Sequence, residues 1–416
     1  MKTPAPLIAA AALLLAASIT RAEDWLDRLD QSLTFNAAEG KVRAHVSGLV
    51  DAEGYLTQKP APGLVFSNRT FLFNPRLTLF LDAQLGSHLY AFAQARFDHG
   101  FDPGYTDAQV RLDEYFLSVK PWEDGRVRVQ AGKFATVAGN WVQRHDSWTN
   151  PFITAPLPYE NLTGMWDGYP VGSADTLFNW SHRPDSGFDT TGADKHLRIP
   201  VIWGPSYASG LAVFGQLGKF DLAGEVKNAS LSSRPGTWDA TAVGFSHPSF
   251  TARFAFRPDP AWNLGVFGST GSYLDHAAQR YVAKGFAFDD YRQTVIGQDI
   301  SFAWHHWQIW AETFATRFEI PGVGNADTLA YYVEAKYKFT PQLFGAFRWN
   351  QHVFGTLPDG AGGCEKWGGD IWRTDFAVGY RFTAHTQLKL QYSLERRAAD
   401  IAGFANTFAA QFTIRF

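Results

Sequence analysis

FANTFAAQFTIRF is the sequence of Phe404–Phe416, with which the printed chain ends. Apolar side chains occupy every second position, and polar or small ones lie between them: Phe408, Ala410, Phe412, Ile414 and Phe416 against Thr407, Ala409, Gln411, Thr413 and Arg415. Such alternation predicts a β-strand with one apolar and one polar face. A soluble sheet would expose this apolar row at an edge, whereas a bilayer covers it. We therefore predict the closing strand of an outer-membrane barrel; the alternative is the last strand of a soluble β-sandwich.

The first 22 residues have the pattern of a secretory signal peptide. Lys2 is followed by the apolar run Leu7–Ala17, and Thr20-Arg21-Ala22 supplies small residues at the spacing of a cleavage site. We expect the mature chain to begin near Glu23. Beyond this segment, no stretch reaches the ~20 apolar residues that a spanning helix needs. The pattern predicts export to the outer membrane without helical spans.

Composition agrees with a barrel. Aromatic residues make up 16% of the chain, yet the mean hydropathy is only −0.20, as expected when polar lumen positions alternate with lipid-facing ones. The net charge of −3 argues against a nucleic-acid partner. The single cysteine, Cys364, cannot form an internal disulfide.

From Lys41 onward, period-two segments alternate with turn sequences, and with the terminal segment they give about 16 strands. One of them, at 110–120, has no assignable face. Counting back from a periplasmic Phe416, connections on the inner side are short and those on the outer side are long, as in outer-membrane barrels. The predicted fold is all-β: a transmembrane antiparallel β-barrel over residues 41–416. Residues 23–40 form a short periplasmic segment, either an amphipathic helix or a flexible tail.

One long connection, residues 133–207, interrupts the alternation. It is rich in tryptophan, and Pro151, Pro156, Pro158 and Pro170 exclude long strands from it. Because a long irregular segment in a compact domain is usually functional, we predict a loop that folds into the barrel and narrows the channel. An external lid is the alternative.

The strand and turn that lead into this loop, RVRVQAGKFATVAG at Arg126–Gly139, resemble the GKF segment of the phosphate-selective porin O and P family. This resemblance implies a sixteen-stranded porin with inward-folded loops, cationic side chains along an anion path and a possible homotrimer. The chain departs from the family in its near-neutral charge and in its loop rich in tryptophan and proline. The expected surroundings are the lipid bilayer and lipopolysaccharide.

Residue type and alternation give the candidate pore-lining residues. From the loop and its approach they are Lys133, Arg144, His145, Asp146, Trp148, Glu160 and Asp167; from the strands they are Arg126, Arg128, Arg253, Arg348 and Arg381. Because basic groups outnumber acidic ones among the inward positions, we expect passive diffusion of small hydrophilic solutes with a mild preference for phosphate or other small anions.

Two other functions remain open at this point. The loop aromatics could stack on sugars, as in a carbohydrate-type porin. A barrel enzyme such as a lipid hydrolase is the second alternative, but the chain has no HExxH, CxxC, Walker or GxSxG motif. We expect no catalytic residues, no metal site and no cofactor.

Overall fold

The computed structural model describes residues 25–58, 70–99, 108–182, 198–236, 245–398 and 403–416. The predicted signal peptide, residues 1–22, lies outside them. Residues 25–32 form a helix. None of the helices in the described ranges is long and apolar enough to cross a membrane.

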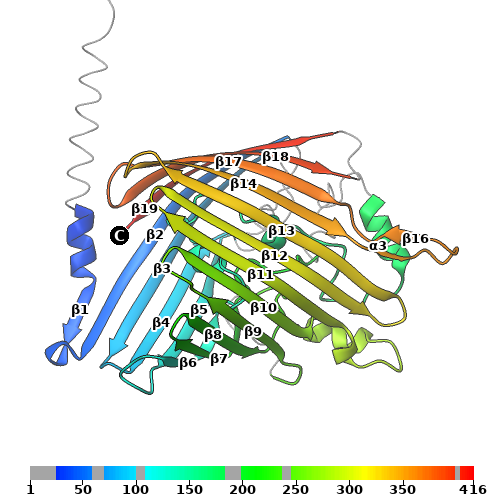
Figure 1. The fold of residues 1–416 in the computed structure, drawn as a ribbon, viewed down its shortest axis with the longest axis horizontal. Coiled ribbons are helices and arrows are strands. Elements are labelled where there is room, and N and C mark those ends of the chain that lie inside the picture. The colour runs from blue at the N-terminus through cyan, green and yellow to red at the C-terminus, as the bar shows by residue number, and fades with distance from the viewer. Residues whose placement is uncertain (1–24, 59–69, 100–107, 183–197, 237–244, 399–402) are drawn as a thin grey trace, which may run out of the picture.

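Sixteen antiparallel strands form a closed barrel (Figure 1). They are β2 Val42–Thr57, β3 Phe71–Leu85, β4 Leu89–Asp98, β5 Gln109–Val119, β6 Val127–Phe134, β7 Ala208–Leu217, β8 Phe220–Lys227, β9 Ser249–Phe256, β10 Trp262–Ser272, β11 Arg292–Trp304, β12 Trp307–Ile320, β13 Gly324–Lys338, β14 Leu343–Phe354, β17 Ile371–Arg381, β18 Thr386–Arg397 and β19 Ala405–Arg415. Each pairs with its neighbour in the chain, and β19 pairs with β2. The predicted closing strand is confirmed.

The alternation that predicted the strands separates the two faces of the wall. On β18, the apolar side chain of Leu390 is 54% exposed on the outside, whereas Lys389 is 0% exposed on the inside. Exposed apolar and buried charged residues reverse the order of a soluble protein. This arrangement suits a wall with lipid on its outer face.

The two barrel ends differ in their connections, and Figure 1 shows the C-terminus and the N-terminal helix at the same end. Tight turns such as 86–88, 218–219 and 305–306 lie at this end, here called the short-turn end. The opposite, long-loop end carries 273–291, 355–370 and the described residues of the β8–β9 connection, 228–236 and 245–248. One connection at the long-loop end is short, because β12 and β13 extend until only residues 321–323 connect them.

Smaller elements decorate the long-loop end and the seam. The short strands β15 Thr356–Pro358 and β16 Cys364–Lys366 pair with each other, and the 3-10 helices η4 His276–Tyr281 and η5 Phe288–Asp290 lie between β10 and β11. Near the seam, where β19 meets β2 and closes the barrel, β1 Thr34–Ala37 and η1 Ala38–Gly40 precede β2. Strand β1 pairs with residues 42–45 of β2.

The segment at 110–120 could not be assigned a face because β5 contains an irregularity. Gln94 of β4 pairs with Glu114, but the next residue, Ala95, pairs with Leu112. Asp113 is therefore an extra residue, as in a β-bulge. It is 1% exposed and forms ion pairs with Arg96 and Arg111. The bulge breaks the period of two that a sequence-based assignment requires.

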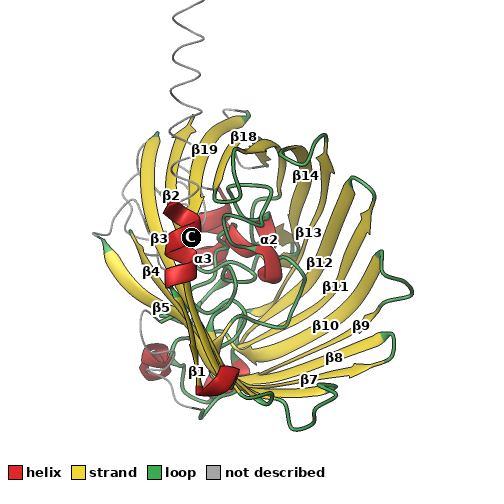
Figure 2. Cartoon of the chain, turned by 90° about the vertical axis from the view of Figure 1, so that its left-hand side faces the viewer, coloured by secondary structure: helices red, strands yellow, loops and turns green. Residues whose placement is uncertain are grey.

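Much of the described connection between β6 and β7 lies within the ring of strands (Figure 2), and its helix α3 Ala174–His182 lies at the long-loop end beside β16 (Figure 1). The connection also contains the 3-10 helix η2 Val142–Arg144 and the short helix α2 Leu157–Glu160. The prediction of an inward-folded loop is confirmed.

Barrel closure supplies a first test. The backbone N–H and C=O of Phe416 bond Gly48 of β2, and a Cβ on Gly48 would lie 2.4 Å from the Phe416 ring. We expect Gly48→Val to lower the unfolding free energy by about 1–3 kcal/mol through overpacking, measured by urea titration of the purified barrel. Gly54→Val is the control, because a Cβ there has open space. Equal stability of the two variants would exclude a packing role for Phe416.

Candidate functional site

A chain of six alternating charges fixes the inner loop to the barrel wall. Arg144 of the loop pairs with Glu334 of β13, which lies 3.6 Å from Arg348 of β14. Arg348 bonds Asp375 of β17 at 2.8 Å, Asp375 lies 3.0 Å from Arg373, and Arg373 pairs with Glu160 of the loop. All six residues are buried. This series of charges begins at Arg144 and ends at Glu160, both in the loop. It therefore connects two points of the loop to the three strands β13, β14 and β17.

The same wall residues also bond the loop backbone. Arg348 donates to the carbonyl oxygen of Thr154 at 3.1 Å, and Arg373 donates to that of Ala155 at 2.6 Å. On β18, Lys389 donates to the carbonyl of Asn150 at 2.9 Å, and Gln391 accepts from the N–H of Ile153 at 2.6 Å. These bonds satisfy groups that would otherwise be buried without partners.

Glu312 of β12 holds the start of the loop. Its carboxylate accepts hydrogen bonds from the backbone N–H groups of Asn140 and Trp141 and from the Tyr159 hydroxyl at 2.6 Å. Gly139 passes close to this carboxylate, since a Cβ there would lie 2.6 Å from Glu312 Oε1, and its φ of +77° favours glycine. Glu225 and Lys227 of β8 bond the segment before it, at Thr136 and Phe134.

Apolar packing completes the attachment. The rings of Trp141 and Tyr159 lie 4.5 Å apart, and Phe314 of β12 meets Tyr159 edge-on at 5.6 Å. Toward the long-loop end, Met165 and Trp203 of the loop belong to a second buried cluster with residues of the outer connections. The loop is thus packed mainly against β10–β18, while β8 holds its first residues.

The other half of the lumen remains open. A cavity of about 1080 Å³ is lined by strands β2–β9 on one side and by the loop on the other. Its lining extends from Lys120 and Gly125 at the short-turn end to Asp98 and Arg111 at the opposite ends of β4 and β5. A water-accessible space therefore follows the barrel from one end toward the other.

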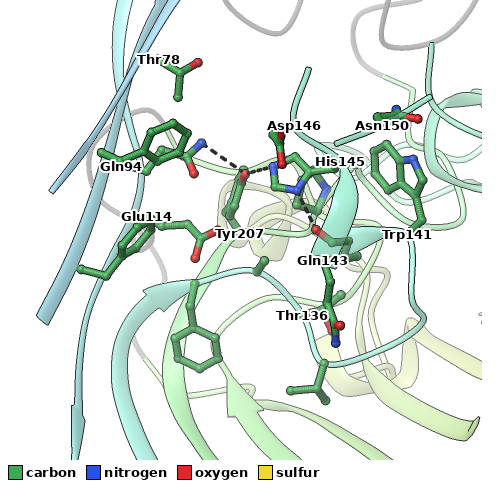
Figure 3. A pocket seen from close by; sticks show the side chains of 18 of the residues that line it. Thr78, Gln94, Glu114, Thr136, Trp141, Gln143, His145, Asp146, Asn150 and Tyr207 are labelled. Carbon is green, nitrogen blue, oxygen red and sulfur yellow. Dashed lines mark hydrogen bonds between the residues drawn. The ribbon is translucent and has the colours of Figure 1, made fainter. Parts of the chain in front are cut away.

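A histidine of the loop faces this cavity (Figure 3). The Nδ1 of His145 lies 2.6 Å from the carbonyl oxygen of Val142, and its Nε2 lies 2.7 Å from the Tyr207 hydroxyl. Burial, together with the positive charge of Arg96, holds the pKa of His145 below its usual value. The imidazole is therefore neutral at pH 7, donating from Nδ1 and accepting the Tyr207 hydroxyl at Nε2.

Most charges on the cavity wall are paired. Arg76 bonds Asp51 at 3.0 Å, Arg96 bonds Asp113 at 3.1 Å, Arg111 bonds Asp98 at 2.9 Å and Arg253 bonds Asp299. Paired arginines contribute little net field. They stabilise the wall and set its shape.

Basic residues gather at the short-turn end of the lumen. Arg381 and Arg415 both lie within 5.0 Å of the centre of the Trp148 ring. Lys336 experiences the positive charges of Arg381, Lys338 and Lys389. Arg415 and Lys338 are exposed, and Arg381 is half-buried. We call Lys338, Arg381 and Arg415 the basic mouth.

The structure separates the predicted pore-lining residues into three groups. Arg126, Arg128, Arg253, His145, Asp146 and Glu160 border the cavity, although Glu160 is 4% exposed and pairs with Arg373. Arg381 and Trp148 meet at the basic mouth. The prediction that Lys133, Arg144 and Arg348 face the solute path is wrong, because all three are buried; Lys133 donates to the carbonyls of Leu112 and Gly236.

Asp167 lies apart from the cavity, near Asp275, whose N–H bonds its carbonyl. Sequence reasoning also missed wall residues that bond the loop backbone, such as Asn350 and Gln391, which accept hydrogen bonds from the N–H groups of Leu157 and Ile153. Period two shows that they point inward, but no sequence signal shows that a loop covers them.

The fold is similar to that of known porins. Similar structures include OmpF of Salmonella typhi (11% identity, 92% of this chain and 100% of that chain, TM-score 0.55) and an anion-selective porin from Comamonas acidovorans (11%, 90% and 100%, 0.53). OmpT of Vibrio cholerae in its trimer form is another (10%, 90% and 99%, 0.52). No protein-family model and no curated protein sequence matches the chain. At these identities the likeness shows a porin-type barrel fold.

The charge chain predicts that Arg348 keeps the loop attached to the barrel wall. Replacing it with glutamine leaves Glu334 and Asp375 buried without their shared cation, which costs about 3–5 kcal/mol when an ion pair is broken this way. We expect Arg348→Gln to make residues 140–160 sensitive to limited proteolysis. Arg253→Gln also breaks a lumenal pair with an aspartate, but it should leave the loop protected. Equal protection in both variants would contradict the anchoring role.

Asp167 gives a pH-dependent prediction. Burial raises its pKa to about 6, although Arg234 acts in the opposite direction. A raised pKa stabilises the fold below the ordinary value of 3.8, and this contribution is lost as the pH rises through about 6. We expect hydrogen exchange around residues 165–170, corrected for the intrinsic pH dependence of amide exchange, to increase between about pH 4 and pH 6. Asp167→Asn should remove that increase; a variant with the same pH dependence would rule out this carboxyl as its cause.

Proposed function

We propose that the chain is an outer-membrane porin through which small hydrophilic solutes diffuse passively, with a mild preference for anions. The observation that carries this proposal is the cavity of about 1080 Å³ between the docked loop and strands β2–β9. The short-turn end would face the periplasm and the long-loop end the exterior, as in other barrels of this type. The exposed apolar outer face supports a bilayer environment.

The basic mouth supports the anion preference. Lys338, Arg381 and Arg415 form no ion pair with a carboxylate in the described part of the chain, whereas the arginines deeper in the lumen are mostly paired. Rings of like charge set ion preference in a pore. Because the basic mouth comprises three residues and the net charge is −3, the preference should be modest.

The resemblance at Arg126–Gly139 suggests a more specific function, a channel selective for phosphate. In this segment the ammonium of Lys133 is committed to two backbone carbonyls. General anion passage is therefore better supported than a phosphate site built on this motif. The carbohydrate alternative is also weakened, since Trp141 and Trp148 are buried and do not offer open ring faces to sugars.

Assembly as a homotrimer belongs to the same proposal. The sequence resemblance implied it, and one outer-membrane protein of similar fold is described in a trimer form. Chemical cross-linking in native membranes would test this part independently of conduction.

Selectivity can be measured as the reversal potential in a planar bilayer under a KCl gradient. We expect the wild-type chain to prefer chloride, and the triple variant Lys338→Gln, Arg381→Gln, Arg415→Gln to lower the chloride-to-potassium permeability ratio about twofold. Arg317→Gln is the control, because Arg317 is exposed on the outer face and pairs with Asp327. No channel activity, or a clear potassium preference in the wild type, would overturn the proposal.

A further inference from the structure

An aromatic surface faces the lumen where a porin wall is normally polar. It consists of Phe80 of β3, Tyr90 and Phe92 of β4, Phe116 of β5 and Phe214 of β7, here called the aromatic wall. Phe92 lies 6.2 Å from Phe80 and 5.3 Å from Phe116 between ring centres, and Tyr90 lies 6.2 Å from Phe116. All five residues border the cavity and all are half-buried.

The position of the aromatic wall is not explained by the barrel alone. Lumen-facing positions of transmembrane barrels are polar because water fills the interior, and apolar surface left facing water marks binding sites. On the opposite half of the lumen, aromatic residues such as Phe314 and Tyr332 are covered by the loop and are 0% exposed. Among the aromatic rings of the described residues, only that of Phe134 covers an edge of the aromatic wall; its centre lies 6.4 Å from the centre of the Phe116 ring.

An arginine lies beside this surface. The guanidinium carbon of Arg128 is 4.1 Å from the centre of the Phe214 ring, directly across the β6–β7 pairing, and its charge acts on Tyr90. Within the described residues it forms no ion pair and no side-chain hydrogen bond. A guanidinium stacked on a ring keeps its N–H edge available, and that edge matches a carboxylate.

We propose that the aromatic wall and Arg128 form a subsite for organic anions that join a carboxylate to an aromatic ring, the simplest being benzoate. The ring of the solute would stack on Phe92 and Phe116, where offset contacts between rings are favourable. Its carboxylate would reach Arg128. This subsite rests on the proposed porin function and specifies a solute class for it.

The charges along the wall orient such a solute. Glu114 lies next in the lumen toward the long-loop end, opposite Gln94, and Arg128 lies toward the short-turn end. Attraction to Arg128 directs the carboxylate toward the short-turn end, where the basic mouth follows. A neutral sugar gains nothing from this gradient, and inorganic phosphate gains nothing from the rings.

The test is block of single-channel current in KCl by three probes: benzoate, acetate and benzyl alcohol. Acetate keeps the carboxylate without the ring, and benzyl alcohol keeps the ring without the charge. We expect benzoate to reduce the current at a concentration about tenfold lower than either, from ring stacking and charge together. Block at equal concentrations of all three would overturn the proposal.

Two variants and their controls locate the block. Phe92→Ala with Phe116→Ala should weaken benzoate block about threefold to tenfold, whereas Phe97→Ala, on the same strand but exposed on the outer face, should not. Arg128→Gln should weaken it as well, whereas Arg257→Gln, which removes a charge paired with Asp221 on the cavity wall, should have less effect.

Chloride conductance of the same channels separates this subsite from the proposed function. A protein that forms no channel would fail both. A conducting channel in which all four variants are blocked equally would overturn the subsite alone. Heat-modifiable electrophoretic mobility shows whether each variant has folded, and a misfolded double variant leaves Arg128→Gln as the deciding comparison.

Discussion

A loop placed inside a barrel must have its backbone polar groups hydrogen-bonded by the wall, and the structure depends on this requirement. Water in a narrow lumen cannot reach every N–H and C=O of a packed segment, and each unsatisfied group costs about 1–3 kcal/mol. The wall supplies the partners from β12 to β18, with the six-charge chain from Arg144 to Glu160 at the centre. Its three cations and three anions compensate one another, so that the attachment adds no net charge to the lumen.

This requirement divides the inward-facing side chains into two classes. Most of those on β12–β18 hold the loop, and most of those on β2–β9 border the open cavity, although Glu225 and Lys227 of β8 also bond the start of the loop. The division is compatible with the proposed anion preference in a chain with a net charge of −3. The charges that attach the loop are neutralised by their partners, whereas Arg381 and Arg415 pack on Trp148 rather than on a carboxylate. Net charge is thus a poor guide to porin selectivity, because ion preference depends on the few groups at the lumen surface.

The sequence predicted the barrel well because strand alternation is local. Each strand shows its own period of two, and the turn residues separate the segments, so the strand count needed no long-range information. The exception, β5, contains the extra residue Asp113. The site was less predictable because its contacts are remote: Asn140 bonds Glu312 across 172 positions, and Arg373 bonds Ala155 across 218. Alternation shows that Arg348 points inward, but it cannot show that the loop buries it.

The aromatic residues follow the same division. In the sequence, Tyr90 and Phe92 blurred the alternation of β4, since both faces of that strand then carry apolar residues. The structure resolves this: Ala91, Ala93 and Ala95 belong to one face, and Tyr90 and Phe92 to the face that borders the cavity. A lumen-facing phenylalanine on β12 is buried by the loop, as Phe314 is, and its role is packing. On β4 and β5 no described part of the loop covers the rings of Phe92 and Phe116, so packing alone does not account for them. The aromatic side chains that depart from alternation on the docked half are therefore explained by contact with the loop, whereas those on the open half are the basis of the proposed subsite.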